Sequence, residues 1–249
     1  MGNLLRPEGL YEHYIHQLRQ TISAYDYSQI VLCEGLQNSL DAIVMVGGGA
    51  HQIEVTMDLD NRSVRILDSG VGFPNEPSLL FLGGGRKKEG AKNLFGRVGV
   101  GLKVVLFASS RFRLRGNDGE SSFLYEVEDA YKFSHDPPPD LLIPDRFSAD
   151  PDPLESRGTE LYYEFPAGTG DDQLEGFFKS VQLACLGQTF SPDQKFAKTL
   201  QRAVDNSVFD SRMSGLIASY LRRFTYVGDV SALWGGKPEL ANTKLKISI

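Results

Sequence analysis

The first fifty residues carry apolar side chains at helical spacing. Residues 10–24 repeat them every four positions, at Leu10, Tyr14, Leu18 and Ile22, which places them on one face of a helix. A second helix is predicted over residues 30–46, because Asp26 or Ser28 can cap its start and the glycines 47–49 end it.

Apolar and polar residues then alternate, which predicts strands. Residues 51–60 and 63–69 alternate on either side of Asp60-Asn61, so they are expected to form a β-hairpin with Asp68 where its second strand ends. Two further strands are predicted around the turn Asn117-Asp118-Gly119, over residues 111–116 and 121–128, and another over residues 158–166.

The segments between these elements have loop composition. Residues 74–97 are rich in glycine and contain Arg86-Lys87-Lys88, which favours a long mobile lid. Residues 98–109 are predicted to be a loop that runs into a helix. Residues 136–156 are acidic and proline-rich, so an irregular path over the surface is expected there.

The pattern changes after residue 170. Three stretches, 171–186, 193–208 and 212–224, space their apolar residues by three and four positions, which predicts helices. The chain stops at residues 244–249, which alternate as in a strand and have no turn after them. We therefore expect one main domain over residues 1–170 and a helical extension over residues 171–249 that leads to a missing downstream domain.

Composition narrows the class of protein without deciding its function. The chain has 249 residues, 41% of them hydrophobic, and a net charge of −6. No apolar run approaches the ~20 residues that span a bilayer, and no secretory signal is visible, so a soluble, cytoplasmic protein is expected. Two cysteines are too few for a disulfide framework. The acidic balance argues against an overall basic nucleic-acid surface, although a local basic patch stays open.

The second helix carries the first candidate site. Glu34, Asn38 and Asp41 stand at i, i+4 and i+7, which aligns them on one helical stripe. An amide oxygen suits Mg²⁺, and a carboxylate beside it can activate water. Glu34 is the candidate general base and Asn38 the candidate metal ligand. Taken alone, the stripe is more often an ordinary solvated helix face.

The second candidate site follows a strand directly. In Asp68-Ser69-Gly70-Val71-Gly72, the carboxylate of Asp68 can accept a hydrogen bond from an exocyclic amino group, and the glycines let the backbone approach a flat base. Adenine fits that description. An ordinary turn after a strand explains this motif equally well.

The third candidate site is the glycine loop that precedes the helix expected to end near residue 108. Gly96, Gly99 and Gly101 permit close approach to phosphate oxygens, and the helix N-terminus offers free N–H groups. Such a motif is weak evidence alone. It fits neither the dinucleotide fingerprint nor the P-loop.

The order of these motifs resembles a known family. ExxxNxxDA from Glu34, DxGxG from Asp68, GxxGxG from Gly96 and the later Gly158-Thr159 are similar to the four ATP-site motifs of the GHKL superfamily. Its members include gyrase B and topoisomerase VI B subunits, large heat-shock chaperones, histidine kinases, MutL and MORC proteins. The NSLDA segment looks most like the topoisomerase VI and MORC-like types, and the resemblance covers residues ~28 to ~166.

This resemblance implies a fold and a role for each matched residue. The fold is a Bergerat-type α/β sandwich, in which helices cover one face of a mixed sheet and ATP lies between helices and lid. Glu34 would polarise the attacking water and Asn38 would hold Mg²⁺. Asp68 would bind the adenine amine, and the remaining adenine-side residues would support or admit the base: Asp41, Thr159, Gly70 and Gly72.

On the phosphate side, the resemblance implies that lid backbone amides wrap the nucleotide at Gly96, Gly99, Val100 and Gly101. Lys103 either reaches a phosphate or lies on the outer face of its helix. The lid cations Arg86, Lys87 and Lys88 are expected in solvent, with a contact to the γ-phosphate or a partner as the less favoured alternative.

The implied function is a slow, Mg²⁺-dependent ATPase whose lid closure and homodimerisation switch a larger machine. Action on DNA, chaperoning and defence all stay open, as does a downstream domain or partner protein. One alternative is a nucleotide sensor that does not hydrolyse ATP. A histidine kinase is less favoured, because His13 and His16 lack the usual acidic neighbour and following proline, and because such kinases have no acid in the role of Glu34.

Overall fold

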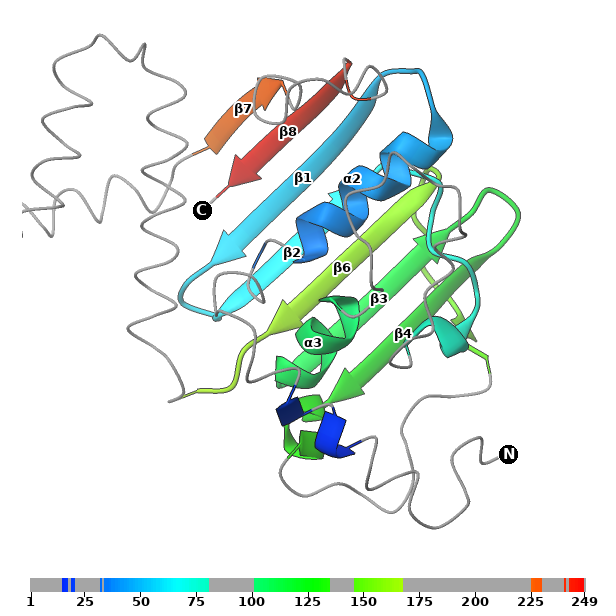
Figure 1. Ribbon diagram of the computed structural model, residues 1–249. Helices are drawn as coiled ribbons and strands as arrows, with labels where there is room; N and C mark the ends of the chain where they lie inside the picture. Colours follow the sequence, from blue (N-terminus) through cyan, green and yellow to red (C-terminus); the bar gives the residue numbers. More distant parts are fainter. Residues whose placement is uncertain are drawn as a thin grey trace, which may run out of the picture.

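A twisted mixed sheet forms the centre of the molecule (Figure 1). The computed structural model describes residues 15–17, 19–20, 32, 34–80, 101–134, 146–167, 225–229, 240 and 242–248. Within them, eight strands are hydrogen-bonded in the order β5-β4-β3-β6-β2-β1-β8-β7. Together with helices α2 and α3, this arrangement is of the α+β class, as the sequence predicts.

The predicted strands and hairpins are confirmed. The strands are β1 (His51–Asp58), β2 (Ser63–Asp68), β3 (Arg111–Asn117), β4 (Ser122–Glu128), β5 (Ser148–Ala149), β6 (Gly158–Glu164), β7 (Thr225–Asp229) and β8 (Thr243–Ser248). The pairs β1/β2 and β3/β4 are antiparallel hairpins, and β6 lies antiparallel between β3 and β2. The register places Thr159 opposite Asp68.

The end of the chain belongs to this sheet. Strand β8 pairs in parallel with β1, in the register His51 to Thr243, and β7 pairs antiparallel with β8. Residues 225–229 lie in the stretch expected to be a helical extension, yet they form a strand. Residues 243–248 form the strand that the alternation at residues 244–249 indicates. A parallel neighbour for β1 provides the ladder hydrogen bonds that its free edge would otherwise lack.

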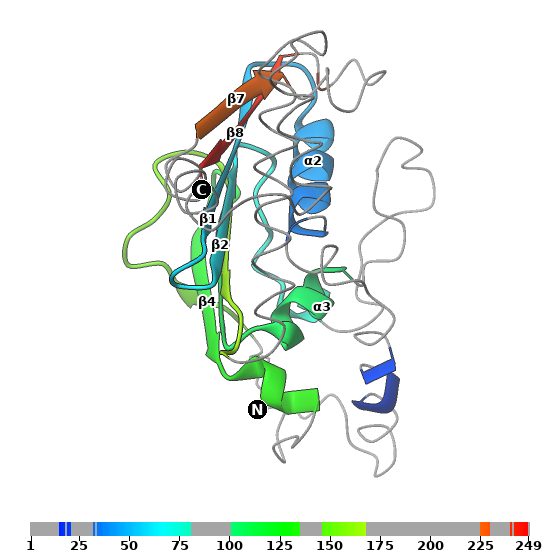
Figure 2. The same ribbon diagram turned by 90° about the vertical axis from the view of Figure 1, so that its left-hand side faces the viewer.

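Two longer helices lie over one face of the sheet (Figure 2). Helix α2 (Glu34–Val46) falls within the predicted second helix, and α3 (Gly101–Ala108) follows the glycine loop. Two short 3₁₀ helices, η2 (Pro77–Leu80) and η3 (Ala130–Ser134), complete the described elements. None of the described helices is long and apolar enough to cross a membrane.

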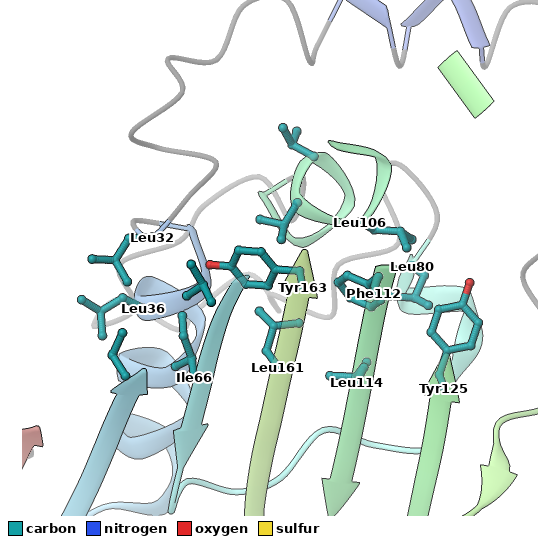
Figure 3. Packing of buried hydrophobic residues seen from close by; sticks show 14 of the residues in the cluster. Leu32, Leu36, Ile66, Leu80, Leu106, Phe112, Leu114, Tyr125, Leu161 and Tyr163 are labelled. Atoms are coloured by element: carbon teal, nitrogen blue, oxygen red, sulfur yellow. The ribbon is translucent and has the colours of Figure 1, made fainter. Parts of the chain in front are cut away.

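The core lies between these helices and the sheet. Figure 3 shows it from close by, with Leu36 of α2 and Leu106 of α3 above Ile66, Leu114 and Leu161 of the strands. These side chains are all buried. Alternate residues of β2, β3 and β6 therefore face the helices, as the period of two predicts.

The opposite face of the sheet is charged. Glu160 of β6 is buried beneath three arginines of the neighbouring strands, Arg65, Arg113 and Arg115, at 2.5, 3.1 and 3.5 Å. Asp150 binds Arg115 from the β5 side at 2.8 Å. Glu160 and Asp150 thus have cationic partners, which offset the cost of burying their charges.

Several predicted features lie outside the described residues. They are the lid beyond residue 80 with its cations, most of the first helix, and the three helices expected over residues 171–224. Of the first helix, residues 15–17 and 19–20 are described and are helical.

Candidate functional site

Asp68 lies at the point where three distant segments of the chain meet. It ends β2, is only 5% exposed, and lies beneath α2. The Ser39 hydroxyl of α2 donates a hydrogen bond to its Oδ2 at 2.8 Å, and the Gly70 amide donates to its Oδ1 at 2.9 Å. The backbone N–H of Thr159 in β6 donates a third. A carboxylate with these donors is held in one orientation.

Burial outweighs these donors in setting the protonation of Asp68. Desolvation raises the pKa of Asp68 from 3.8 to about 6, although the hydrogen bonds from Gly70, Ser39 and Thr159 lower it. Above about pH 6 the carboxyl group is therefore an ionised acceptor, and below that it carries a proton. Binding of a ligand amino group to the carboxylate should accordingly strengthen as pH rises through 6.

Folding stability should fall as pH rises, whereas binding to the carboxylate strengthens. Because the pKa of Asp68 is higher in the folded chain, the folded state binds this proton more tightly, and stability falls as pH rises from about 4 to about 6. The rise in pKa corresponds to roughly 3 kcal/mol. Denaturant unfolding from pH 4 to 7.5 should show this slope, and Asp68→Asn should lack its contribution. Equal slopes in both chains would contradict the buried, proton-binding Asp68.

The loop after Asp68 packs against α2 on one side and the β3–β4 turn on the other. A Cβ at Gly70 would lie 2.6 Å from the Cβ of Ala42, and the Val71 amide donates to the Ala42 carbonyl at 3.1 Å. Gly72 has φ of +80° and packs on the Asn117 carbonyl. Both positions therefore require glycine for packing within the protein. From the sequence, glycine is expected there for a different reason, to leave space for a bound base.

Glu34, the first residue of α2, lies next to the start of α3. A Cβ added at Gly101 would overlap its carboxylate, so the acid rests directly beside the first residue of α3. Negative charge is favourable near a helix N-terminus, where N–H groups have no partner within the helix. The structure thus brings together two of the predicted site residues, Glu34 and Gly101.

Asn38 is one helical turn further along α2. Its Nδ2 is buried and has no hydrogen-bond partner within the part of the chain that the structure describes. An unsatisfied buried amide costs free energy, and a bound ligand with oxygen atoms would satisfy it. The described ranges hold no cluster of three or more His, Cys, Asp or Glu residues. The amide oxygen of Asn38 is a ligand of the kind that Mg²⁺ prefers.

The other predicted site residues are placed only in part. Asp41 is buried on α2 at 5% exposure, and Thr159 is half-buried opposite Asp68. Lys103 is only 3% exposed, so it does not lie on an outer, solvent-facing side of α3. Gly96, Gly99 and Val100 lie outside the described residues.

Sequence reasoning missed two residues of this region. Ser39 lies inside the first motif, but its contact with Asp68 depends on how α2 packs on β2. Arg157 directly precedes Gly158-Thr159, and its Nε donates to the Val71 carbonyl at 2.8 Å. The available signal was their position next to recognised motifs.

Comparison with known proteins leaves the family open. No family model matches the chain, and no curated protein matches it.

Proposed function

We propose that this chain is a Bergerat-type, GHKL-like module that binds ATP and hydrolyses it slowly with Mg²⁺. The observation that carries the proposal is the convergence of α2, the loop after β2 and the start of β6 on the buried Asp68. These segments contain three of the four motifs on which the resemblance rests. The mixed sheet with α2 and α3 on one face agrees with that fold type.

Asp68 is suited to select the base. Above about pH 6 it is a carboxylate that accepts three hydrogen bonds, from Ser39, Gly70 and Thr159. Each carboxylate oxygen has two acceptor sites, so capacity remains for the exocyclic amine of adenine. Guanine presents a carbonyl oxygen at the equivalent position, which a carboxylate repels. The pocket should therefore prefer ATP to GTP.

Glu34 is suited to act on water at the phosphate end. Its carboxylate lies beside the N-terminus of α3, where backbone N–H groups favour phosphate oxygens. A carboxylate there can orient a water and accept its proton as the water attacks the γ-phosphate. Asn38 would hold Mg²⁺, which neutralises phosphate charge when bound. Lid closure and homodimerisation on ATP binding remain part of the proposal, with a sensor that does not hydrolyse ATP as the alternative.

An NMR titration tests the location of the site. A non-hydrolysable ATP analogue with Mg²⁺ should shift the amide signals of Ser39, Gly70 and Thr159, while residues of β7 stay unchanged. The matching GTP analogue should shift them much less at equal concentration. Shifts confined to other parts of the chain, or no shifts at all, would contradict the proposal.

Gly101→Ala should lower ATP hydrolysis by displacing Glu34. Its new methyl group would occupy the place of the Glu34 carboxylate, and the flexible acid can move away at little cost to folding. We expect ATP turnover to fall about tenfold to a hundredfold, since displacing a general base removes part of a contribution of roughly 10²–10⁴. Steady-state phosphate release checks this, with thermal unfolding as the control for folding. An unchanged rate would place the base elsewhere.

A further inference from the structure

We propose that Arg157 is a positioning residue of the adenine pocket, so that the functional motif at the start of β6 is Arg-Gly-Thr. This inference rests on the proposed function. Arg157 holds the loop that follows Asp68, and through it the Gly70 amide, one of the donors that orient the carboxylate.

Three consecutive residues close on this loop from the β6 side. The Arg157 Nε donates to the Val71 carbonyl at 2.8 Å. Gly158 packs so closely on the Asp68 carbonyl that a Cβ would overlap it. Thr159 donates its backbone N–H to the Asp68 carboxylate. Only the first of these contacts depends on the identity of a long side chain.

Helix α2 holds the same loop from the other side. The Val71 amide donates to the Ala42 carbonyl at 3.1 Å, and Gly70 packs on Ala42. Both backbone polar groups of Val71 are therefore bound, one to the helix and one to Arg157. The Gly70 amide, which donates to Asp68, belongs to the residue directly before Val71. Fixing Val71 thus fixes that donor.

Removal of Arg157 should affect binding more than folding. Its side chain is exposed, so the Val71 carbonyl can bind water instead and little stability is lost. The loop then samples more conformations, and a ligand must order it again on binding, which weakens affinity. A net hydrogen bond of this kind contributes about 0.5–1.5 kcal/mol, or roughly a two- to tenfold change in Kd.

Arg62 provides a matched control at the opposite end of the same strand pair. It lies just before β2, and it donates from Nε to the Phe165 carbonyl at 3.3 Å and from Nη2 to the Pro166 carbonyl at 2.7 Å. Like Arg157, it joins β2 and β6 through backbone carbonyls. It is remote from Asp68, since β2 begins at Ser63 and ends at Asp68.

The experiment compares Arg157→Ala, Arg157→Lys and Arg62→Ala with the natural chain. Affinity for a non-hydrolysable ATP analogue is measured by titration, and amide hydrogen exchange is measured without nucleotide. Arg157→Ala should raise Kd roughly two- to tenfold and speed exchange at Gly70 and Val71. Arg157→Lys should recover most of the affinity, because its ammonium can still donate. Arg62→Ala should leave Kd unchanged, and exchange at Gly70 and Val71 should stay as in the natural chain.

The outcomes separate the two proposals. If the natural chain binds the analogue and Arg157→Ala binds it equally well, the role of Arg157 is wrong while the proposed function stands. Equal weakening by Arg62→Ala would also overturn it, since the effect would then reflect the stability of the β2/β6 pair. If the natural chain binds no nucleotide, the proposed function falls and the role of Arg157 falls with it.

Discussion

Glu34→Gln should lower the rate of ATP hydrolysis by about 10²- to 10⁴-fold while the affinity for ATP changes little. Glutamine keeps the size of the side chain and its place beside Gly101, but it cannot accept the proton of the attacking water. Single-turnover hydrolysis, measured at saturating ATP, reports the chemical step directly.

Glu54→Gln is the control for this variant. Glu54 lies on β1 and pairs with Lys246 of β8 at 3.3 Å, away from α2 and α3. Its replacement should leave turnover unchanged. If Glu34→Gln hydrolyses ATP at the natural rate, Glu34 is not the base. If the natural chain binds ATP without measurable turnover, the chain is a nucleotide sensor.

Asp68→Asn should weaken ATP binding by roughly 10- to 150-fold, since hydrogen bonds to charged groups contribute about 1.5–3 kcal/mol. The amide that replaces the carboxylate has an NH₂ group, and the Ser39 hydroxyl and the Gly70 amide already donate toward this position. One oxygen is thus exchanged for a donor that faces other donors. Competition with a fluorescent adenine nucleotide measures the loss.

Asp129→Asn tests whether any aspartate after a strand would have the same effect. Asp129 directly follows β4 but is exposed, where it pairs with Lys132 at 2.7 Å. We expect its replacement to leave affinity unchanged. If Asp68→Asn keeps full affinity, nucleotide binding does not depend on the Asp68 carboxylate. The base would then bind elsewhere.

The parts of the fold that depend on neighbouring residues could be predicted from the sequence. Most of β1 and β2 alternates between apolar and polar residues, and the short turn at Asp60-Asn61 joins them, so pattern and turn agree on a hairpin. The parallel pairing of β1 with β8 could not be predicted, because 184 residues lie between Asp58 and Thr243. Strand β7 was missed because its five residues include Gly228 and show little alternation.

The same distinction applies to the candidate site: some of its residues could be predicted from local sequence, and others could not. Glu34, Asn38 and Asp68 stand out because their spacing or their place after a strand is visible in the sequence. The contact of Ser39 with Asp68 depends on how α2 packs on the sheet, and the contact of Arg157 with Val71 joins residues 86 positions apart. Such contacts follow from tertiary packing, which no local pattern reports.

The most direct test of an adenine site at Asp68 is a calorimetric titration of the natural chain with a non-hydrolysable ATP analogue and Mg²⁺ at pH 7.5. At this pH Asp68 is ionised, since its pKa is about 6. We predict one site with a Kd in the micromolar range, about −8 kcal/mol, and much weaker binding of the matching GTP analogue. A folded chain that releases no heat with either nucleotide, or that binds both equally, would contradict the account.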